Sequence, residues 1–306
     1  MLVLRGFQRS APTSTVLTIG NFDGVHLGHR ALLEQLTRTA RAEGLPAAVL
    51  TFEPHPREFF DPANAPARLT TLREKLELLG EYGVDLVTIA RFNAAFAALS
   101  AAQFIEQVLI DSLKVRHLII GDDFRFGARR AGDFALLQQV GAARGFRVEA
   151  MASVVAAATR VSSSAVREAL AAGDMERAAV LLGRPYAIDG TVVHGDKRGR
   201  QLGFPTANIR IKHDPLPMTG VFAVQVSGIG PLPRAGVANL GLRPTVEGTR
   251  PLLEIHLFDF SGDIYGAHLN VRFVHKLRDE MKFPGLEALR VQIDRDAQAA
   301  RAIFGI

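Results

Sequence analysis

Residues 14–32, STVLTIGNFDGVHLGHRAL, place an apolar strand, a glycine-rich turn and the start of a helix in direct succession. The β-branched run at 14–20 is typical of a buried strand, and it ends in a glycine. After the turn, leucines spaced three or four residues apart give one face of a helix that ends at Gly44. A strand that passes through glycines into a helix predicts an α/β sheet with a ligand site at the turn.

Further apolar runs follow this first strand and alternate with amphipathic helical patterns. Because the runs are continuously apolar, they predict parallel strands that helices cover on both faces. The first part of the chain is therefore expected to be an α/β domain with a parallel sheet. Its further strands are predicted at 47–52, 84–90, 116–121 and 146–155, and its further helices at 71–82, 100–113 and 131–144.

The pattern changes near residue 183, where short strands punctuated by Gly, Pro and Asp begin. Period-2 alternation in several of them predicts a small antiparallel barrel or sandwich, closed by a C-terminal helix that Pro284 opens. We expect two domains, residues 1–183 and residues 184–306. The strands of the second are predicted at 187–195, 206–211, 220–228, 234–241, 252–260 and 268–278.

The composition limits the classes of function. The 306 residues include no cysteine, which excludes disulfides, Cys-based zinc sites and a Cys nucleophile. No apolar run approaches the roughly 20 residues that span a bilayer, and the N-terminus lacks a signal-peptide core, so a cytoplasmic protein without membrane contact is expected. The net charge of +5 suits a binder of polyphosphates or of nucleic acid. Aromatic residues are few and no basic stripe accompanies them, so nucleic acid is not expected as a partner.

The turn at 20–32 carries His26 and His29 on one side of the first helical turn. Its glycines, Gly20, Gly24 and Gly28, allow the backbone to approach a ligand, and a helix N-terminus attracts anions. The positive end of the helix dipole is expected to lower the pKa of both histidines, which leaves neutral imidazoles in the empty site. From this stretch alone, zinc ligation with Asp23 nearby and ordinary surface packing remain alternatives.

Two later stretches have the composition of nucleotide-binding loops. GDDFRFG (121–127) follows a predicted strand and could contact a nucleoside, although a solvated turn is the simpler interpretation. TRVSSSAVREAL (159–170) places three hydroxyls between Arg160 and Arg167, just before a helix. Such hydroxyls and guanidiniums can hold phosphate oxygens, and a serine there can equally cap the helix.

The segments GNFDGVHLGH, TFEPHP, GDDFRFG and RVSSSAVR together resemble the adenylyltransferase module of bacterial bifunctional riboflavin kinase/FAD synthetases. Within that resemblance, Ser164 stands where a threonine is common. The resemblance implies a Rossmann-like nucleotidyltransferase fold. It also implies that the phosphate of FMN attacks the α-phosphorus of ATP and that pyrophosphate leaves. The implied nucleotide contacts are Gly20, Phe22, Asp23, Gly24, His26, Gly28 and His29, with Asp123 near the adenosine and Arg160, Ser163, Ser164 and Arg167 on the phosphates.

A second phosphate-binding pattern is GDKRGRQLGFPTANI at 195–209. Glycines permit close approach to phosphates and basic side chains add charge, although the spacing is not that of a P-loop and an ordinary basic turn remains an alternative. Thr206 and Asn208 point the same way if they lie on a strand, and their oxygens suit Mg²⁺. The loop residues of interest are Gly195, Lys197, Arg198, Gly199, Gly203 and Pro205.

The stretch LLEIHLFDF (252–260) alternates, with Leu253, Ile255 and Leu257 on one face. Glu254 then lies on the opposite face, held by a rigid strand, where it could accept a proton from a hydroxyl. A solvated surface carboxylate is the alternative.

GFPTANI, GVFAVQV, GVANLGLRPTV, LEIHLFDF and LRDEMKF resemble, in this order, the riboflavin kinase domain. That resemblance implies that Thr206 and Asn208 bind Mg²⁺–ATP, that Glu254 activates the riboflavin 5′-hydroxyl, and that the flavin lies between barrel and C-terminal helix. The whole chain is then expected to convert riboflavin to FMN and FMN to FAD, each with ATP, as a monomer. The alternative is a single-function adenylyltransferase whose β-domain binds a regulatory ligand.

Overall fold

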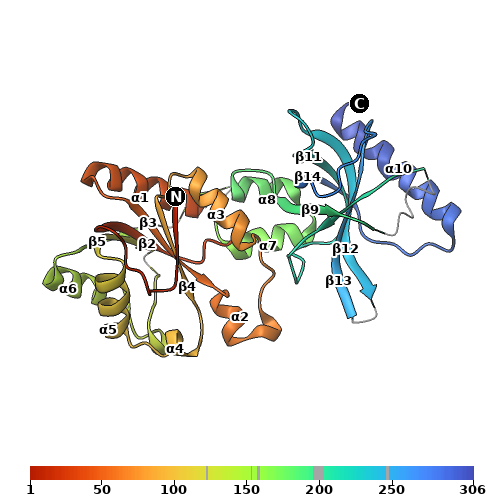
Figure 1. Ribbon diagram of the computed structural model, residues 1–306. Coiled ribbons are helices and arrows are strands. Elements are labelled where there is room, and N and C mark those ends of the chain that lie inside the picture. The colour runs from red at the N-terminus through yellow and green to blue at the C-terminus, as the bar shows by residue number, and fades with distance from the viewer. Residues whose placement is uncertain (122, 153, 157–158, 196–202, 246–247) are drawn as a thin grey trace. The chain divides into compact units, whose positions relative to one another are not determined.

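The structure, a computed structural model, describes residues 1–306 except 122, 153, 157–158, 196–202 and 246–247 (Figure 1). The chain packs into two compact units. The first comprises Met1–Pro66 with Leu72–Val161, and the second comprises Ala67–Thr71 with Ser162–Ile306. The second unit therefore includes the two helices at residues 163–172 and 175–182, which precede the expected boundary. A domain boundary at residues 183–184 stays a prediction.

The first unit contains a six-stranded parallel sheet in the order β1-β4-β3-β2-β5-β6. The edge strand β1 is absent from the sequence prediction because it has only four residues, LVLR, which give no buried apolar run. The strands are β1 (Leu2–Arg5), β2 (Thr15–Ile19), β3 (Ala47–Glu53), β4 (Leu86–Arg91), β5 (Val115–Gly121) and β6 (Arg147–Met151). A separate antiparallel pair consists of β7 (Val155–Ala156) and β8 (Thr159–Arg160).

Helices cover both faces of this sheet, which confirms the expected α/β class (Figure 1). Successive strand residues face opposite sides: Val16 packs with α1 and α3, and Leu17 packs with η2 and α6. The predicted helix at 100–113 is a short α5 followed by a π-helical stretch, η2, a difference that side-chain periodicity does not reveal. The helices are α1 (Leu27–Glu43), α2 (Pro56–Phe60), η1 (Pro62–Asn64), α3 (Leu72–Glu81), α4 (Ala94–Ala97), α5 (Ala101–Gln103), η2 (Phe104–Ser112), η3 (Ala128–Arg130) and α6 (Phe134–Arg144).

The strand order places a topological switch point between β2 and β5. From β2 the chain moves outward to β3 and β4, and it then returns to pair β5 with the other side of β2. In open α/β sheets, ligands bind beyond the carboxyl ends of the strands at this point. The loops after β2 and β5, which begin at Gly20 and Gly121, meet that condition.

The second unit contains a closed antiparallel barrel: strand alternation alone leaves barrel and sandwich open, and the barrel that the family resemblance implies is confirmed. It closes because β9 pairs with both β10 and β14. Leu253, Ile255 and Leu257 are buried and Glu254 is partly exposed, which confirms the predicted alternation. The strands, in the order β10-β13-β12-β11-β14-β9 around the barrel, are β9 (Ala187–Val193), β10 (Ala207–Arg210), β11 (Gly220–Ser227), β12 (Arg234–Thr245), β13 (Gly248–Leu257) and β14 (His268–Arg278).

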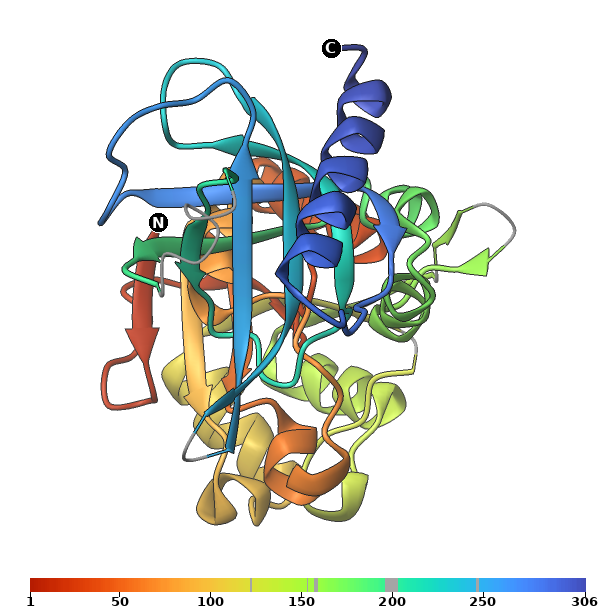
Figure 2. The same ribbon diagram turned by 90° about the vertical axis from the view of Figure 1, so that its right-hand side faces the viewer.

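In the part of the second unit that the structure describes, helices α7 (Ser163–Ala172), α8 (Met175–Leu182) and α10 (Leu286–Phe304) accompany the barrel, and α10 lies alongside it (Figure 2). Its alanines, Ala297 and Ala300, pack on outward-facing residues of β11 and β12. A buried ion pair holds the helix: Arg278 donates to Asp296 through Nε at 3.0 Å and through Nη2 at 2.7 Å. The other helices, α7 and α8, pack against each other, and α8 contacts β14.

The ion pair between Arg278 and Asp296 yields a stability prediction. Their side chains are 18% and 7% exposed, so Asp296→Ala leaves a largely buried guanidinium unpaired. We expect the barrel unit to lose about 3–5 kcal/mol of unfolding free energy, measured by urea denaturation. The matched control is Glu287→Ala, which removes the exposed partner of Arg290 on the same helix and should leave the transition almost unchanged. Equal effects of the two variants would contradict this account of how α10 is held.

Candidate active sites

The turn after β2 is held in an uncommon backbone conformation. Phe22, Gly24 and Val25 have φ angles of 48°, 81° and 39°, and both Phe22 and Val25 are fully buried. A positive φ at a bulky or β-branched residue costs on the order of 1–3 kcal/mol and persists only where packing enforces it. Here the packing comes from the core that the turn shares with α1 and α3. The turn delivers His26 to the N-terminus of α1.

His26 caps helix α1 and stacks on His29. The backbone N–H of His29 donates to Nδ1 of His26 at 3.3 Å, and the two ring centroids are 3.7 Å apart with an interplanar angle of 12°. Because Nδ1 accepts this bond, the neutral imidazole of His26 carries its proton on Nε2, where it can donate to a ligand. A Cβ on Gly28 would lie 3.2 Å from the His26 ring, so the glycine leaves room for the stack.

The imidazole of His29 is held neutral by its surroundings. Burial is the largest cause that lowers its pKa well below the ordinary value, and the neighbouring His26 and Lys75 lower the pKa further. The sequence predicts that the helix dipole lowers the pKa of both histidines. The direction is confirmed for His29, but its main cause is burial and not the dipole. Within the described residues, Nδ1 of His29 is buried without a hydrogen-bond partner.

The buried Lys75 lowers the pKa of His29 and so belongs to this site, although the motifs of the sequence do not indicate it. It lies on α3 and is 5% exposed. A lysine three residues after Leu72 and four before Leu79, on the apolar face of a predicted helix, is the signal that could have identified it. Among the described residues, no group of three or more His, Cys, Asp or Glu side chains is arranged to hold a metal ion.

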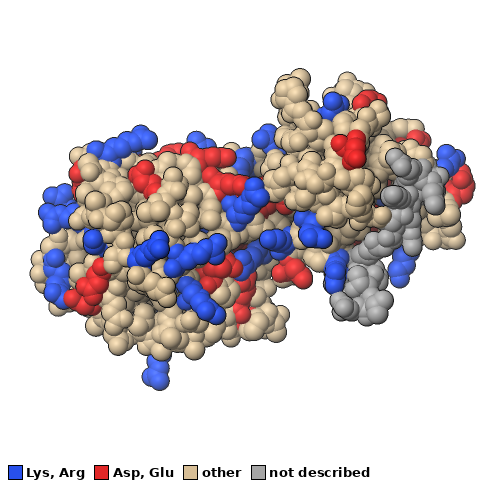
Figure 3. All heavy atoms as spheres, viewed as in Figure 1, with Lys and Arg blue, Asp and Glu red and all other residues tan. Residues whose placement is uncertain are grey.

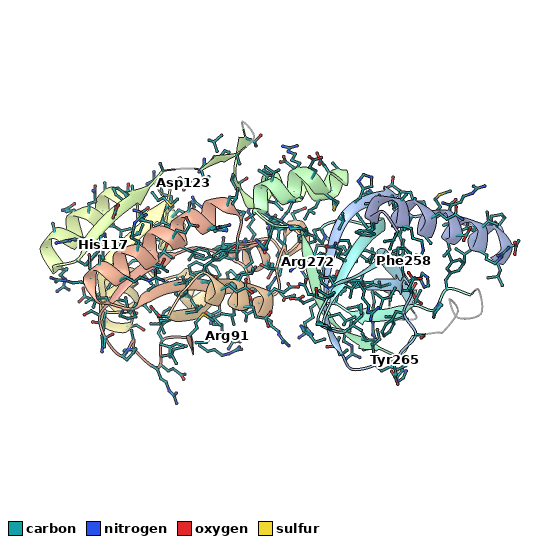
Figure 4. All side chains as sticks on the ribbon, turned by 90° about the horizontal axis from the view of Figure 1, so that it is seen from above. Arg91, His117, Asp123, Phe258, Tyr265 and Arg272 are labelled. Carbon is teal, nitrogen blue, oxygen red and sulfur yellow. The ribbon has the colours of Figure 1, made fainter. Side chains whose placement is uncertain are left out.

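Asp123 and Arg160 meet although 37 positions separate them. Arg160 Nη2 donates to Asp123 Oδ2 at 2.8 Å beyond the end of β5, and both side chains are exposed (Figure 4). The nearby Arg125 has a structural contact instead, because it donates to Asp133, the residue that caps α6. Two of the predicted site residues are thus brought together at the switch-point edge of the sheet.

The serine-rich stretch divides into a capping residue and two further hydroxyls. Ser162 caps α7 by accepting from the backbone N–H of Ala165, so Ser163 and Ser164 begin the first helical turn. Arg167 Nε donates to the carbonyl of Ala67 at 2.6 Å. Ser163, Ser164 and Arg167 all belong to the second unit, and the predicted serine capping is confirmed for Ser162.

A cluster of phenylalanines lies at the carboxyl ends of β3 and β4, and the sequence patterns do not predict it. Phe59, Phe60 and Phe92 contact one another edge to face at centroid distances of 5.2–5.6 Å, and Phe52 and Phe96 extend the cluster. Phe60 is 67% exposed. These rings come from two segments, residues 52–60 and 92–96, that lie more than 30 positions apart, so no local pattern unites them. We call them the phenylalanine cluster.

In the barrel, Asn208 on β10 lies directly opposite Glu254 on β13. Directly opposed residues of an antiparallel pair share a face, with Cβ atoms about 5 Å apart. Asn208 is buried, and a Cβ on Gly195 would overlap its side-chain amide, so the glycine makes room for it. Thr206 is partly buried and lies one residue before β10. The predicted amide, hydroxyl and carboxylate are therefore neighbours.

The residues next to Thr206, Asn208 and Glu254 are held by a hydrogen bond and by ring contacts. The Nδ1–H of His256 donates to the carbonyl of Pro205 at 2.9 Å, and Phe204 packs edge to face on the same imidazole. Gly203 has a φ of 86°, which favours glycine. On the side of α10, Phe258 is buried beneath Arg301 (Figure 4). The predicted contacts Lys197, Arg198 and Gly199 lie outside the described residues.

The charged side chains on one face of the molecule can be followed in Figure 3. On the face in view in Figure 3, Lys and Arg side chains are interspersed with Asp and Glu. A helix long and apolar enough to cross a membrane is not found in the part of the chain that the structure describes.

The first unit has the fold and the site of a nucleotide-binding α/β enzyme, and the second is a barrel with oxygen donors and a carboxylate on its surface. Models of two families match the chain, FAD synthetase at residues 8–165 and riboflavin kinase at residues 182–304. The chain therefore belongs to the family of bifunctional riboflavin kinase/FMN adenylyltransferases.

Full-length relatives support this assignment. A protein described as bifunctional riboflavin kinase/FMN adenylyltransferase from Escherichia coli strain K12 is 50% identical over 100% of this chain and 99% of its own length. One of the same description from Haemophilus influenzae is 51% identical over 99% of each chain. A solved structure from Streptococcus pneumoniae, described as a macrolide-efflux protein, matches with a TM-score of 0.84 and 28% identity over 98% of this chain and 99% of that one. That last similarity supports the fold of the whole chain.

The neutral state of His29 gives a prediction for stability against pH. Its pKa is lower in the folded protein than in the unfolded chain, so the unfolded chain binds more protons below about pH 6.5 and stability falls as the pH falls. We expect His29→Gln to lose less unfolding free energy than the wild type between about pH 8 and pH 5.5, measured by urea denaturation. The exposed His268→Gln is the control and should follow the wild type. Parallel curves for His29→Gln and the wild type would contradict the burial of a neutral imidazole.

The contact between Gly195 and Asn208 gives a second prediction. In Gly195→Ala the added methyl group displaces the Asn208 amide, and a shift of about 1 Å can reduce a rate about 10²-fold. We expect such a loss in riboflavin phosphorylation, with FMN adenylylation retained, when both rates are measured on the full-length protein. Gly230→Ala is the matched control, because no atom lies within 4 Å of the Cβ it adds. Equal kinase rates in the two variants would remove Asn208 from the site.

Proposed function

We propose that the two reactions of the family take place at two separate sites, one on the barrel and one at the parallel sheet. The barrel phosphorylates riboflavin at its 5′-hydroxyl, with Glu254 as the general base. The parallel-sheet unit supplies the histidine site at which FMN is adenylylated. By its family the chain is both a riboflavin kinase and an FMN adenylyltransferase.

The observation that carries the kinase assignment is the cross-strand pair of Asn208 and Glu254. A carboxylate on a rigid strand, beside oxygen donors suited to a nucleotide complex, is positioned to take the proton of an attacking hydroxyl. In this step the hydroxyl proton passes to Glu254, the hydroxyl oxygen bonds to the γ-phosphorus of ATP, and ADP leaves. Such a transfer depends mainly on positioning and on stabilisation of charge.

The donors present fit a magnesium ion. The hydroxyl of Thr206 and the amide oxygen of Asn208 are hard oxygen ligands, and Asn208 is buried against Gly195 on the face that it shares with Glu254. Mg²⁺ bound with ATP would neutralise phosphate charge at this position. The basic loop residues Lys197 and Arg198 are proposed as further phosphate contacts on the evidence of the sequence.

For adenylyl transfer, the N-terminus of α1 and its histidines are proposed to hold the triphosphate. Nε2–H of His26 donates to a phosphate oxygen, and the neutral His29 becomes a stronger donor as negative charge arrives. A phosphate oxygen of FMN bonds to the α-phosphorus of ATP while the bond to the β-phosphate bridge breaks and pyrophosphate leaves. Stabilisation of charge by prearranged donors is enough for this reaction, because it needs no covalent enzyme intermediate.

The remaining predicted residues have supporting roles in this proposal. Asp123 contacts the adenosine while paired with Arg160, and Arg160 also reaches the phosphates. The hydroxyls of Ser163 and Ser164 and the guanidinium of Arg167 are proposed phosphate contacts by resemblance. Phe22, Asp23 and Gly24 shape the turn that approaches the nucleotide.

The phenylalanine cluster is proposed to receive the flavin ring of FMN. Its exposed ring, Phe60, presents a flat apolar surface at the carboxyl edge of the sheet that carries the histidines. Planar aromatic ligands bind such surfaces through offset and edge-to-face contacts. The expected cytoplasmic location and monomeric state remain predictions.

The division of labour is tested by two substitutions in the full-length protein. Glu254→Gln removes the proton acceptor and keeps the shape of the side chain, so we expect riboflavin phosphorylation to fall by about 10²–10⁴-fold. Adenylylation of supplied FMN should persist in this variant. His29→Ala should show the opposite pattern, with FAD formation lost and FMN formation retained, when products are separated by chromatography.

Equal loss of both activities in either variant would contradict two separate sites. Near-normal kinase activity of Glu254→Gln would remove Glu254 from its role. Complete absence of kinase activity in the wild-type protein would favour the alternative, an adenylyltransferase with a regulatory β-domain.

A further inference from the structure

The strand that flanks Glu254 on its other side carries a second amide. Asn239 on β12 lies directly opposite Glu254, just as Asn208 does on β10. The three side chains therefore form one row across β10, β13 and β12 on the outer face of the barrel, with the carboxylate in the middle. Neighbouring Cβ atoms in such a row are about 5 Å apart, which is within reach of an amide-to-carboxylate hydrogen bond.

Two segments bound the row at its Asn239 end. On β11, the residue opposite Asn239 is Val221, which belongs to the apolar core beneath α10. Two positions further along β12 on the same face is Gly241, and a Cβ there would overlap the carboxylate of Glu280. Asn239 is partly buried between these segments. Its polar neighbour within the row is Glu254.

The same barrel contains another asparagine that lies directly opposite a carboxylate. Asn270 on β14 lies directly opposite Asp189 on β9. Its Nδ2 donates to Oδ1 of Asp189 at 2.7 Å. In this barrel an asparagine directly across the ladder from a carboxylate can therefore donate to it, as Asn270 does.

We propose that Asn239 is a positioning residue for the kinase reaction: its side-chain amide makes no hydrogen bond to a described residue in the structure, and its place opposite Glu254 lets it donate to the carboxylate and hold it towards the riboflavin 5′-hydroxyl when the substrate is bound. This inference rests on the proposed role of Glu254. The N–H donor stabilises the ionised carboxylate, which is the form that can accept a proton, and it restricts rotation of a long side chain. Asn208, on the other side, remains available for the nucleotide complex.

Other charged groups near this face remain unchanged in the variants below. They come from β10, from Glu254's own strand β13 and the turn after it, from the segment after β14 and from α10. They are Arg210, Arg250, His256, Glu280 and the ion pair between Arg301 and Asp259.

The test is the pH profile of kcat for riboflavin phosphorylation by the full-length protein. In Asn239→Ala the ionised carboxylate loses a donor, so the acid limb of the profile should move up by about one pH unit. At the pH optimum, kcat should fall about tenfold through lost orientation while KM for riboflavin changes little. Asn239→Asp places a second carboxylate opposite Glu254 and should move the acid limb further in the same direction.

Asn270→Ala is the matched control, since it removes an amide-to-carboxylate pair from the same barrel away from Glu254. It should lower thermal stability without moving the acid limb, and FMN adenylylation should be unchanged in all variants. An unmoved acid limb in Asn239→Ala, or a rise in KM alone, would overturn the positioning role. An active Glu254→Gln variant would instead overturn the proposed function itself, so the two failures are distinguishable.

Discussion

Both sites depend on backbone pairing between strands that lie far apart in the sequence. In the first unit, the parallel pairing of β5 with β2 brings the loop of Asp123 to the same sheet edge as the histidine turn. In the barrel, the ladders that β13 forms with β10 and β12 place two amides beside one carboxylate. A slip of one residue in either ladder would turn the side chains to the opposite face and dismantle the row. The inward burial of Leu253 and Ile255 opposes such a slip.

The histidine turn shows how packing prepares an anion site before the anion arrives. Phe22 and Val25 adopt unfavourable backbone angles because their side chains are fully buried in the core with α1 and α3. That conformation gives His26 the cap position, and the cap bond determines which nitrogen carries the proton. Burial and the charge of Lys75 keep His29 neutral. Core packing thus sets both the geometry and the protonation of the site.

The two units meet the same chemical demand, the handling of ATP phosphates, with different parts. In the proposed scheme the parallel sheet uses a helix N-terminus with histidine donors, and the barrel uses the oxygens of Thr206 and Asn208 beside the carboxylate of Glu254. The difference follows from the reactions. A hydroxyl nucleophile must give up a proton and needs a base, whereas the phosphate of FMN already carries negative charge and needs only placement.

The sequence by itself determined the features that have a local period. Continuous apolar runs predict the parallel strands other than β1, and alternation predicts the six barrel strands and the outward position of Glu254, because a side chain's face depends only on its neighbours along the strand. Motif resemblance indicated both activities and the barrel. Only the tertiary structure decided the pairing that closes the barrel, the burial that governs His29, the phenylalanine cluster and the place of Asn239 beside Glu254. Each of these depends on which distant segments pack or pair together, and no local pattern specifies the register between two strands.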